Sequence, residues 1–153
     1  MKPGPAIAVA SLLATSCSGH GPRAPTTARH VVLVTIDTLR ADRLGCYGSR
    51  TVETPHLDRI AGEGTIALQA SASVPLTLPS HASLMTGRVP PEHGLRDNFA
   101  PPLPPSVPTL AELFKNAGFQ TAGFVSSPVL AARTRLNRGF ETYADDEGRM
   151  RVK

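Results

Sequence analysis

The sequence predicts an α/β protein in which short strands alternate with helices in layers around one core. Strand patterns at 30–36, 65–73 and 119–125 are separated by segments with helix-start and helix-stop residues. Such alternation is typical of a sheet covered by helices. The chain has 153 residues, of which 41% are hydrophobic, and this is enough for one domain with its own core.

The clearest strand is His30–Ile36, an unbroken run of β-branched and other apolar residues after the histidine. A continuous apolar run predicts a strand covered on both faces, in the middle of a parallel sheet. Asp37 follows at once, at the carboxyl end where open α/β sheets place their ligands.

Helices are predicted where capping residues precede an apolar face. Thr54 and the proline after it predict a helix over Pro55–Glu63. A short helix is predicted over Pro79–Thr86 and ends at a glycine. The sequence Thr-Leu-Ala-Glu at 109–112 forms a capping box, which predicts a third helix over Leu110–Ala117.

The rest of the chain has weaker signals. Residues 88–108 are rich in proline and are predicted to be loop, while 129–136 are predicted to be helical. No internal repeat is visible.

The first 17 residues resemble a lipoprotein-type signal peptide. An apolar run at 6–14 is too short to span a bilayer, and small residues precede Cys17. Lipidation of Cys17 would make this an exported protein, periplasmic or anchored to the outer membrane of a bacterium. Ordinary secretion and a chance apolar stretch are the alternatives. Residues 18–29 are then a flexible linker, and 30–153 form the domain.

Composition and charge narrow the range of partners. The formal net charge is +4, but the basic residues do not cluster as they do on nucleic-acid-binding surfaces, so no nucleic acid is expected. The mean hydropathy of -0.08 argues against an integral membrane protein. A mild positive balance suits a small anionic substrate and equally suits plain solubility.

Three motifs lie in order between residues 31 and 125. Val34–Gly48 contains Asp37 and reads VTIDTLRADRLGCYG, Thr54–Ala61 reads TPHLDRIA, and Thr77–Gly87 reads TLPSHASLMTG. Together they closely resemble the N-terminal part of sulfatases, a family of the alkaline phosphatase superfamily. The resemblance implies an alkaline-phosphatase-like layered α/β/α sheet, hydrolysis of sulfate esters and a divalent metal ion.

The third motif departs from the family pattern at two positions. Sulfatases have a cysteine or serine, oxidised to formylglycine, where Thr77 stands, and an arginine where His81 stands. Threonine cannot become formylglycine, so direct attack by the Thr77 alkoxide is expected. Phosphodiesterase branches of the superfamily use an unmodified threonine. A phosphodiesterase or phosphonate monoester hydrolase is therefore the alternative enzyme, and a plain helix cap the structural alternative for Thr77.

The expected site combines a hydroxyl, a metal and an anion-binding helix end. Unpaired N–H groups at a helix N-terminus favour a sulfate or phosphate beside Thr77. Threonine is a weak nucleophile without a base or a metal, so Asp37 and Thr77 are expected to bind calcium or magnesium, or alternatively zinc. His81 is expected to donate to the anion in place of arginine. Arg40 pairs either with the substrate oxyanion or with a carboxylate such as Asp42.

The resemblance also implies parts that do not occur in these 153 residues. Many sulfatases have a second aspartate where Thr38 stands, and an aspartate–histidine or aspartate–asparagine pair far downstream. Asp37 and Thr77 give two ligands, whereas metals take about four to eight. The sequence therefore predicts an incomplete, N-terminal portion of the fold, with a non-catalytic remnant as the alternative to an enzyme. Asp97-Asn98 lies where related proteins have a short loop around an asparagine near the site.

Overall fold

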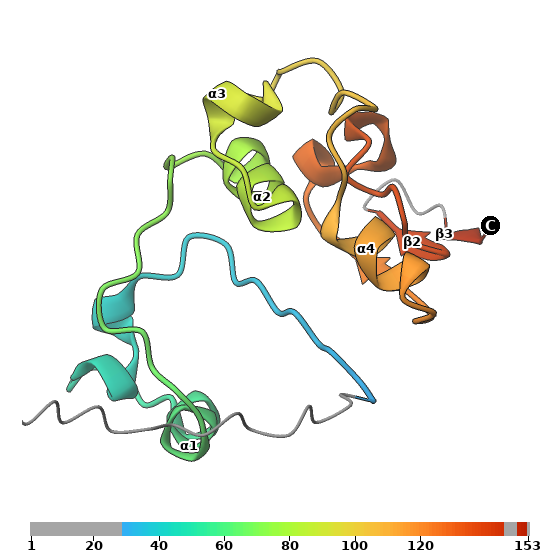
Figure 1. Ribbon diagram of the computed structural model, residues 1–153. Coiled ribbons are helices and arrows are strands. Elements are labelled where there is room, and N and C mark those ends of the chain that lie inside the picture. Colours follow the sequence, from blue (N-terminus) through green and yellow to red (C-terminus); the bar gives the residue numbers. More distant parts are fainter. Residues whose placement is uncertain (1–28, 146–149, 153) are drawn as a thin grey trace, which may run out of the picture. The chain divides into compact units, whose positions relative to one another are not determined.

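The computed structural model describes residues 29–145 and 150–152. It divides into two units, Met1–Thr35 and Ile36–Lys153. Within the described part of the second unit, helices predominate and a short sheet lies near the C-terminus (Figure 1). None of the described helices is long and apolar enough to cross a membrane. The signal-peptide prediction, including Cys17, lies outside the described residues.

The segment His30–Ile36 is extended but is not a strand, so that prediction is wrong for this structure. Its apolar side chains are exposed, with Val32 at 82%. A central parallel strand is stable only when neighbouring strands take its backbone hydrogen bonds and helices cover its faces. The predicted strand at 65–73 is wrong for the same reason, because that segment makes no strand pairing either.

The first helix, α1 (Pro55–Glu63), has the predicted bounds, but Thr54 does not cap it through its side chain. The Thr54 hydroxyl accepts from the N–H of Gly45 at 2.8 Å and donates to Oδ1 of Asp58 at 3.0 Å. Asp58 Oδ1 also accepts from the N–H of Cys46 at 2.7 Å. These bonds fasten the 3₁₀ turn η2 (Gly45–Tyr47), which follows η1 (Ala41–Arg43), to the start of α1.

Helix α2 (Thr77–Thr86) begins two residues earlier than predicted, so Thr77 is its first residue rather than its cap. The predicted loop at 88–108 contains a one-turn helix, α3 (Pro90–His93), which packs against α2 (Figure 1). Proline at the start of a helix needs no N–H partner, which explains how this turn forms in a proline-rich segment.

Helix α4 (Leu110–Asn116) confirms the predicted capping box. The Thr109 hydroxyl accepts from the Glu112 N–H at 3.2 Å, and the Glu112 carboxylate accepts from the Thr109 N–H at 2.8 Å. The Thr109 hydroxyl donates in turn to the Arg138 carbonyl at 2.8 Å. The same residue therefore starts α4 and ties it to a distant loop.

The described sheet has the order β1-β2-β3. Strand β1 (Ala122–Phe124) falls within the third predicted strand and runs parallel to β2 (Thr142–Ala144). Strand β3 (Met150–Val152) is antiparallel to β2. Between β1 and β2 the predicted helix at 129–136 is instead two 3₁₀ turns, η3 (Pro128–Leu130) and η4 (Ala132–Thr134). Helices with a partly parallel sheet confirm the α/β class, in an incomplete form.

The hydrophobic core lies beneath α2. Leu78 and Ala82 of that helix are buried against side chains from the following loop and the 3₁₀ turns. The buried cluster comprises Leu78, Ala82, Leu95, Leu103, Val107, Leu130 and Leu136. Because the buried face of α2 begins at Leu78, the core fixes the helix end that carries Thr77.

Candidate active site

Thr77 and Asp37, which lie 40 positions apart in the sequence, are hydrogen-bonded in the structure. Oγ1 of Thr77 donates to Oδ2 of Asp37 at 3.0 Å. Thr77 is half-buried and Asp37 is exposed. The next residue, Thr38, has a φ of 56°, a left-handed conformation that is uncommon for a residue with a branched Cβ. The chain therefore turns sharply directly after the carboxylate.

The N–H groups at the start of α2 are mostly occupied. Oδ1 of Asn98 accepts from the Leu78 N–H at 2.9 Å, Pro79 has no N–H, and the Ser80 N–H bonds to the Leu76 carbonyl at 3.0 Å. The first turn of α2 therefore has fewer free backbone N–H groups than the sequence led us to expect. In the described residues only the N–H of Thr77 itself has no partner in this turn.

His81 is tied to the first turn of the same helix. Its Nδ1 lies 2.8 Å from the carbonyl oxygen of Thr77. A carbonyl only accepts, so Nδ1 carries the proton and Nε2 of the neutral ring is an acceptor. Donation from Nε2 to an anion, the role expected for His81, thus requires the protonated imidazolium.

Arg40 adopts the second of its two expected pairings. Its Nε and Nη2 donate to the two carboxylate oxygens of Asp42 at 2.8 and 2.7 Å. The hydrogen bond from Arg40 is the main reason that the pKa of Asp42 is lowered, and Asp42 raises the pKa of Arg40 in return. Both side chains are exposed, so this pair is held weakly and can exchange partners.

The oxygen donors of Asp37 and Thr77 suit calcium or magnesium better than zinc, which commonly takes nitrogen or sulfur ligands. Thr77 Oγ1 and Asp37 Oδ2 are 3.0 Å apart, so both oxygens could be adjacent ligands of one cation. No cluster of three or more His, Cys, Asp or Glu side chains occurs among residues 29–145 that could complete such a shell. The predicted metal ligands are therefore brought together, but as a pair.

A second histidine, His93, is fully buried against α2. Its Nδ1 accepts from the Leu95 N–H at 3.1 Å, so the proton is on Nε2, which lies 3.1 Å from Oγ of Ser83. Burial disfavours the charged ring and lowers the pKa of His93. His93 therefore has a structural role, in the packing of α2 against the one-turn helix α3.

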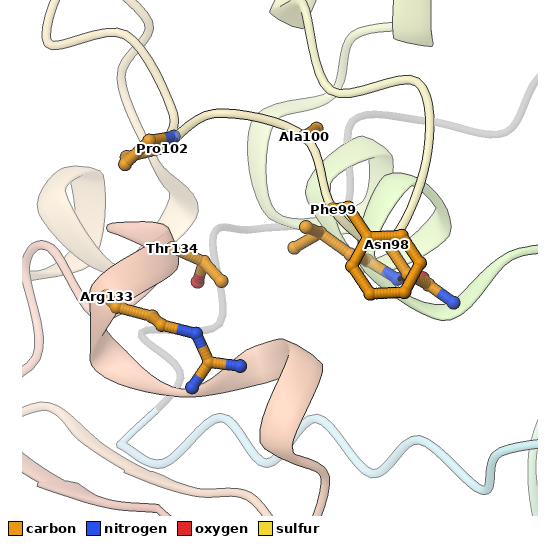
Figure 2. A pocket seen from close by; sticks show the side chains of 7 residues that line it. Asn98, Phe99, Ala100, Pro102, Arg133 and Thr134 are labelled. Atoms are coloured by element: carbon orange, nitrogen blue, oxygen red, sulfur yellow. Dashed lines mark hydrogen bonds between the residues drawn. The ribbon is translucent and has the colours of Figure 1, made fainter.

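A cavity of about 310 Å³ opens beside the start of α2. It is lined by Leu78, Asn98, Phe99, Ala100, Pro102, Arg133 and Thr134. In Figure 2 the loop with Asn98 and Phe99 lies opposite the turn with Arg133 and Thr134. This cavity was not predictable from the sequence, because its two walls are separated by more than thirty positions. The one available signal was Asn98, which the structure bonds to the residue after Thr77.

Comparisons with known proteins agree with this fold. The sulfatase family profile matches residues 29–151. The chain is 40% identical to mouse steryl-sulfatase over 115 residues, 69% of this chain and 18% of that protein. It is 33% identical to dog N-acetylgalactosamine-6-sulfatase over 120 residues, 71% of this chain and 23% of that protein. The solved structure of a 2-O GAG sulfatase matches with a TM-score of 0.60 and 30% identity, over 71% of this chain and 23% of that one.

The fold is therefore of the alkaline-phosphatase-like α/β class, present here in part. The chain belongs to the sulfatase family. It spans about a fifth of the length of the relatives it matches.

Proposed function

We propose that this protein hydrolyses sulfate esters and that Thr77 is its nucleophile. The proposal is supported by membership of the sulfatase family together with one contact, the 3.0 Å hydrogen bond between Thr77 Oγ1 and Asp37 Oδ2 at the first turn of α2. An aligned hydroxyl and carboxylate at the family's nucleophile position are more than a helix cap requires, because Thr77 is not the capping residue of α2.

In the proposed reaction the Thr77 hydroxyl gives up its proton to solvent, Oγ1 forms a bond to sulfur, and the bond from sulfur to the alkoxide oxygen of the leaving group breaks. Water then attacks the sulfated Thr77 and releases sulfate. A carboxylate is a far weaker base than an alkoxide, so Asp37 alone does not deprotonate Thr77. A divalent cation, when bound by these two oxygens, would supply the positive charge that favours the alkoxide.

The groups that would contact the sulfate oxygens are few. The Thr77 N–H is the one backbone donor left at this turn among the described residues, and the amide Nδ2 of Asn98 lies nearby. His81 adds a donor when its ring is protonated, and it is then the group that would give a proton to the leaving alcohol.

Hydrolysis of phosphodiesters or phosphonate monoesters is a second candidate, favoured by the identity of Thr77. Threonine cannot be oxidised to formylglycine, and an unmodified hydroxyl serves either anion. In both cases we propose a small anionic ester as the substrate and no nucleic acid.

We also propose export as a lipoprotein attached to the membrane through Cys17.

Parallel assays of the full protein with an aryl sulfate, a phosphate monoester and a phosphodiester test these activities. Thr77→Ala is expected to lower kcat for the preferred ester by about a thousandfold or more, since loss of a nucleophile removes the main reaction path. Thr77→Ser keeps the hydroxyl and should retain part of the rate. Chelation of divalent ions should abolish turnover.

Thr86→Ala is the matched control. Thr86 lies at the other end of α2, and its hydroxyl donates to the Ala82 carbonyl at 2.6 Å. It should therefore share any effect on the stability of α2 without touching the site. Activity that survives in Thr77→Ala would show that the nucleophile is elsewhere.

A further inference from the structure

His93 has both of its ring nitrogens fixed, one by its own loop and one by helix α2. Nδ1 accepts from the Leu95 N–H at 3.1 Å, so the one N–H of the neutral ring is at Nε2. That group lies 3.1 Å from Oγ of Ser83 and also bonds to the backbone of Pro79. Proline has no N–H, so the acceptor there is the Pro79 carbonyl. A single N–H therefore holds two positions of α2 that are one helical turn apart.

These bonds reach the end of α2 that carries Thr77. Pro79 is buried and lies two residues after Thr77. Between them, the Leu78 N–H donates to Oδ1 of Asn98 at 2.9 Å. Because His93 and Asn98 belong to the same short segment, residues 93–98 hold the first turn of α2 through a carbonyl and through an N–H.

The bond to Ser83 also connects the segment that leads into α2. Oγ of Ser73 donates to Oγ of Ser83 at 3.0 Å, so the chain before α2 and the chain after it meet at one side chain. Packing alone does not account for the histidine, because an apolar side chain would fill the same buried space without the cost of desolvating a polar ring.

We propose that His93 is a positioning residue, whose Nε2–H holds the first turn of α2 through Pro79 and Ser83 so that Thr77 is aimed at the sulfur. The inference rests on the proposed function, because it takes Thr77 as the nucleophile. It goes further by giving a part in the reaction to a side chain that does not contact the reacting atoms. Aim matters because a displacement of about 1 Å can cost roughly a hundredfold in rate.

Two amide variants separate the two ring nitrogens. Glutamine places an amide N–H where Nε2 of His93 lies, and asparagine places an amide oxygen where Nδ1 lies. His93→Gln therefore keeps the bonds to α2 and loses the bond from Leu95, whereas His93→Asn does the reverse. Both remove one side of the hydrogen bonding of the ring, so both should lower the melting temperature by similar amounts.

The full protein is assayed with its preferred ester. His93→Asn should lower kcat about tenfold to a hundredfold with KM within about twofold of wild type, because aim is lost while substrate contacts remain. His93→Gln and the control Thr86→Ala, at the far end of α2, should keep the wild-type kcat. Ser83→Ala, which removes one of the two acceptors, should give an intermediate kcat.

Equal kcat losses in His93→Gln and His93→Asn would overturn the proposal, since a merely structural histidine would give that result. A wild-type kcat in His93→Asn, or a change confined to KM, would overturn it as well. If His93→Asn does not fold, a wild-type kcat in Ser83→Ala decides against the proposal.

Amide hydrogen exchange of the native protein needs no turnover. The Ser80 N–H bonds to the Leu76 carbonyl at 3.0 Å in the first turn of α2, and the Gly87 N–H bonds to the Ser83 carbonyl at 2.9 Å in the last. His93→Asn should speed exchange at Ser80 about tenfold relative to Gly87, the effect of one lost hydrogen bond, and His93→Gln should leave the ratio unchanged.

The two measurements separate this inference from the proposed function. Faster exchange of the first turn in His93→Asn alone, without Thr77-dependent turnover of any ester, would support the hold of His93 on α2 and refute the proposed function. An unchanged exchange ratio in His93→Asn would refute the positioning role even if Thr77-dependent hydrolysis were found.

Discussion

Substitution of Gly139 by alanine tests the packing of the loop that closes against α4. Gly139 has a φ of +87°, and a Cβ there would lie 2.1 Å from the Glu112 nitrogen. The approach is this close because the loop is tied down on both sides. The Gly139 carbonyl accepts from Thr121 Oγ1 at 2.6 Å, and Thr109 bonds to the preceding residue.

The magnitude follows from comparison with Gly118, which has the same φ of +87° but no atom within 4 Å of the added Cβ. A left-handed conformation costs a residue with Cβ about 1–2 kcal/mol, and Gly118→Ala should lose that much stability. Gly139→Ala should lose a further 1–3 kcal/mol or so from steric overlap with backbone that cannot rotate away, for a total of about 2–5 kcal/mol. The effect of alanine on the unfolded chain is common to both variants and cancels.

Urea unfolding followed by circular dichroism measures both variants. With a slope of about 2 kcal/mol per molar urea, Gly139→Ala should lower the midpoint by about 1–2.5 M. Gly118→Ala should lower it by about half a molar to one molar on the same slope. Equal midpoints for the two alanine variants would refute the argument, because the close approach to α4 would then not exist in solution.

Three further outcomes are expected. The pKa of His93 is lowered by burial, so below about pH 6.5 the unfolded chain binds a proton that the native chain does not. The free energy of unfolding should therefore fall as pH drops from 6.5 or so towards the lower native pKa, and an unchanged slope in His93→Gln would contradict this. Arg40→Ala should leave the melting temperature unchanged, whereas a lower kcat/KM would show that Arg40 leaves Asp42 for the substrate. A clickable fatty acid should label the protein in a bacterial host, and Cys17→Ser should prevent labelling.

Local signals predicted the helices well. The Thr109–Glu112 capping box and the bounds of α1 were predictable because capping and proline preferences act within one turn of the chain. α2 starts earlier than predicted because the Leu78 N–H is satisfied by Asn98, twenty residues later. A partner at that separation leaves no pattern in the residues beside the helix.

Strands were predicted less well, and for a physical reason. The apolar run at His30–Ile36 has the composition of a central strand, but composition does not provide the neighbours that a strand needs. β1 lies within its predicted range because β2 pairs with it in parallel. A strand predicted from the composition of one segment therefore does not form where no other segment pairs with it.

The candidate site shows the same division between local and distant information. The motifs around Asp37 and Thr77 identified both residues, and the structure places their side chains within hydrogen-bonding distance. The cavity next to Leu78 was not predictable, because Phe99 and Arg133 come together only through the packing of the core. Candidate site residues were thus readable from motifs, whereas the cavity required the fold.

The first turn of α2 has few backbone N–H groups that could bind the negative charge of a sulfate. A helix end with several free N–H groups could bind a sulfate through its backbone alone, but Pro79 lacks a donor and Asn98 occupies that of Leu78. One backbone donor cannot balance a sulfate beside the carboxylate of Asp37. Under the proposed function, a cation held by the Asp37–Thr77 pair would supply the positive charge that the helix end does not.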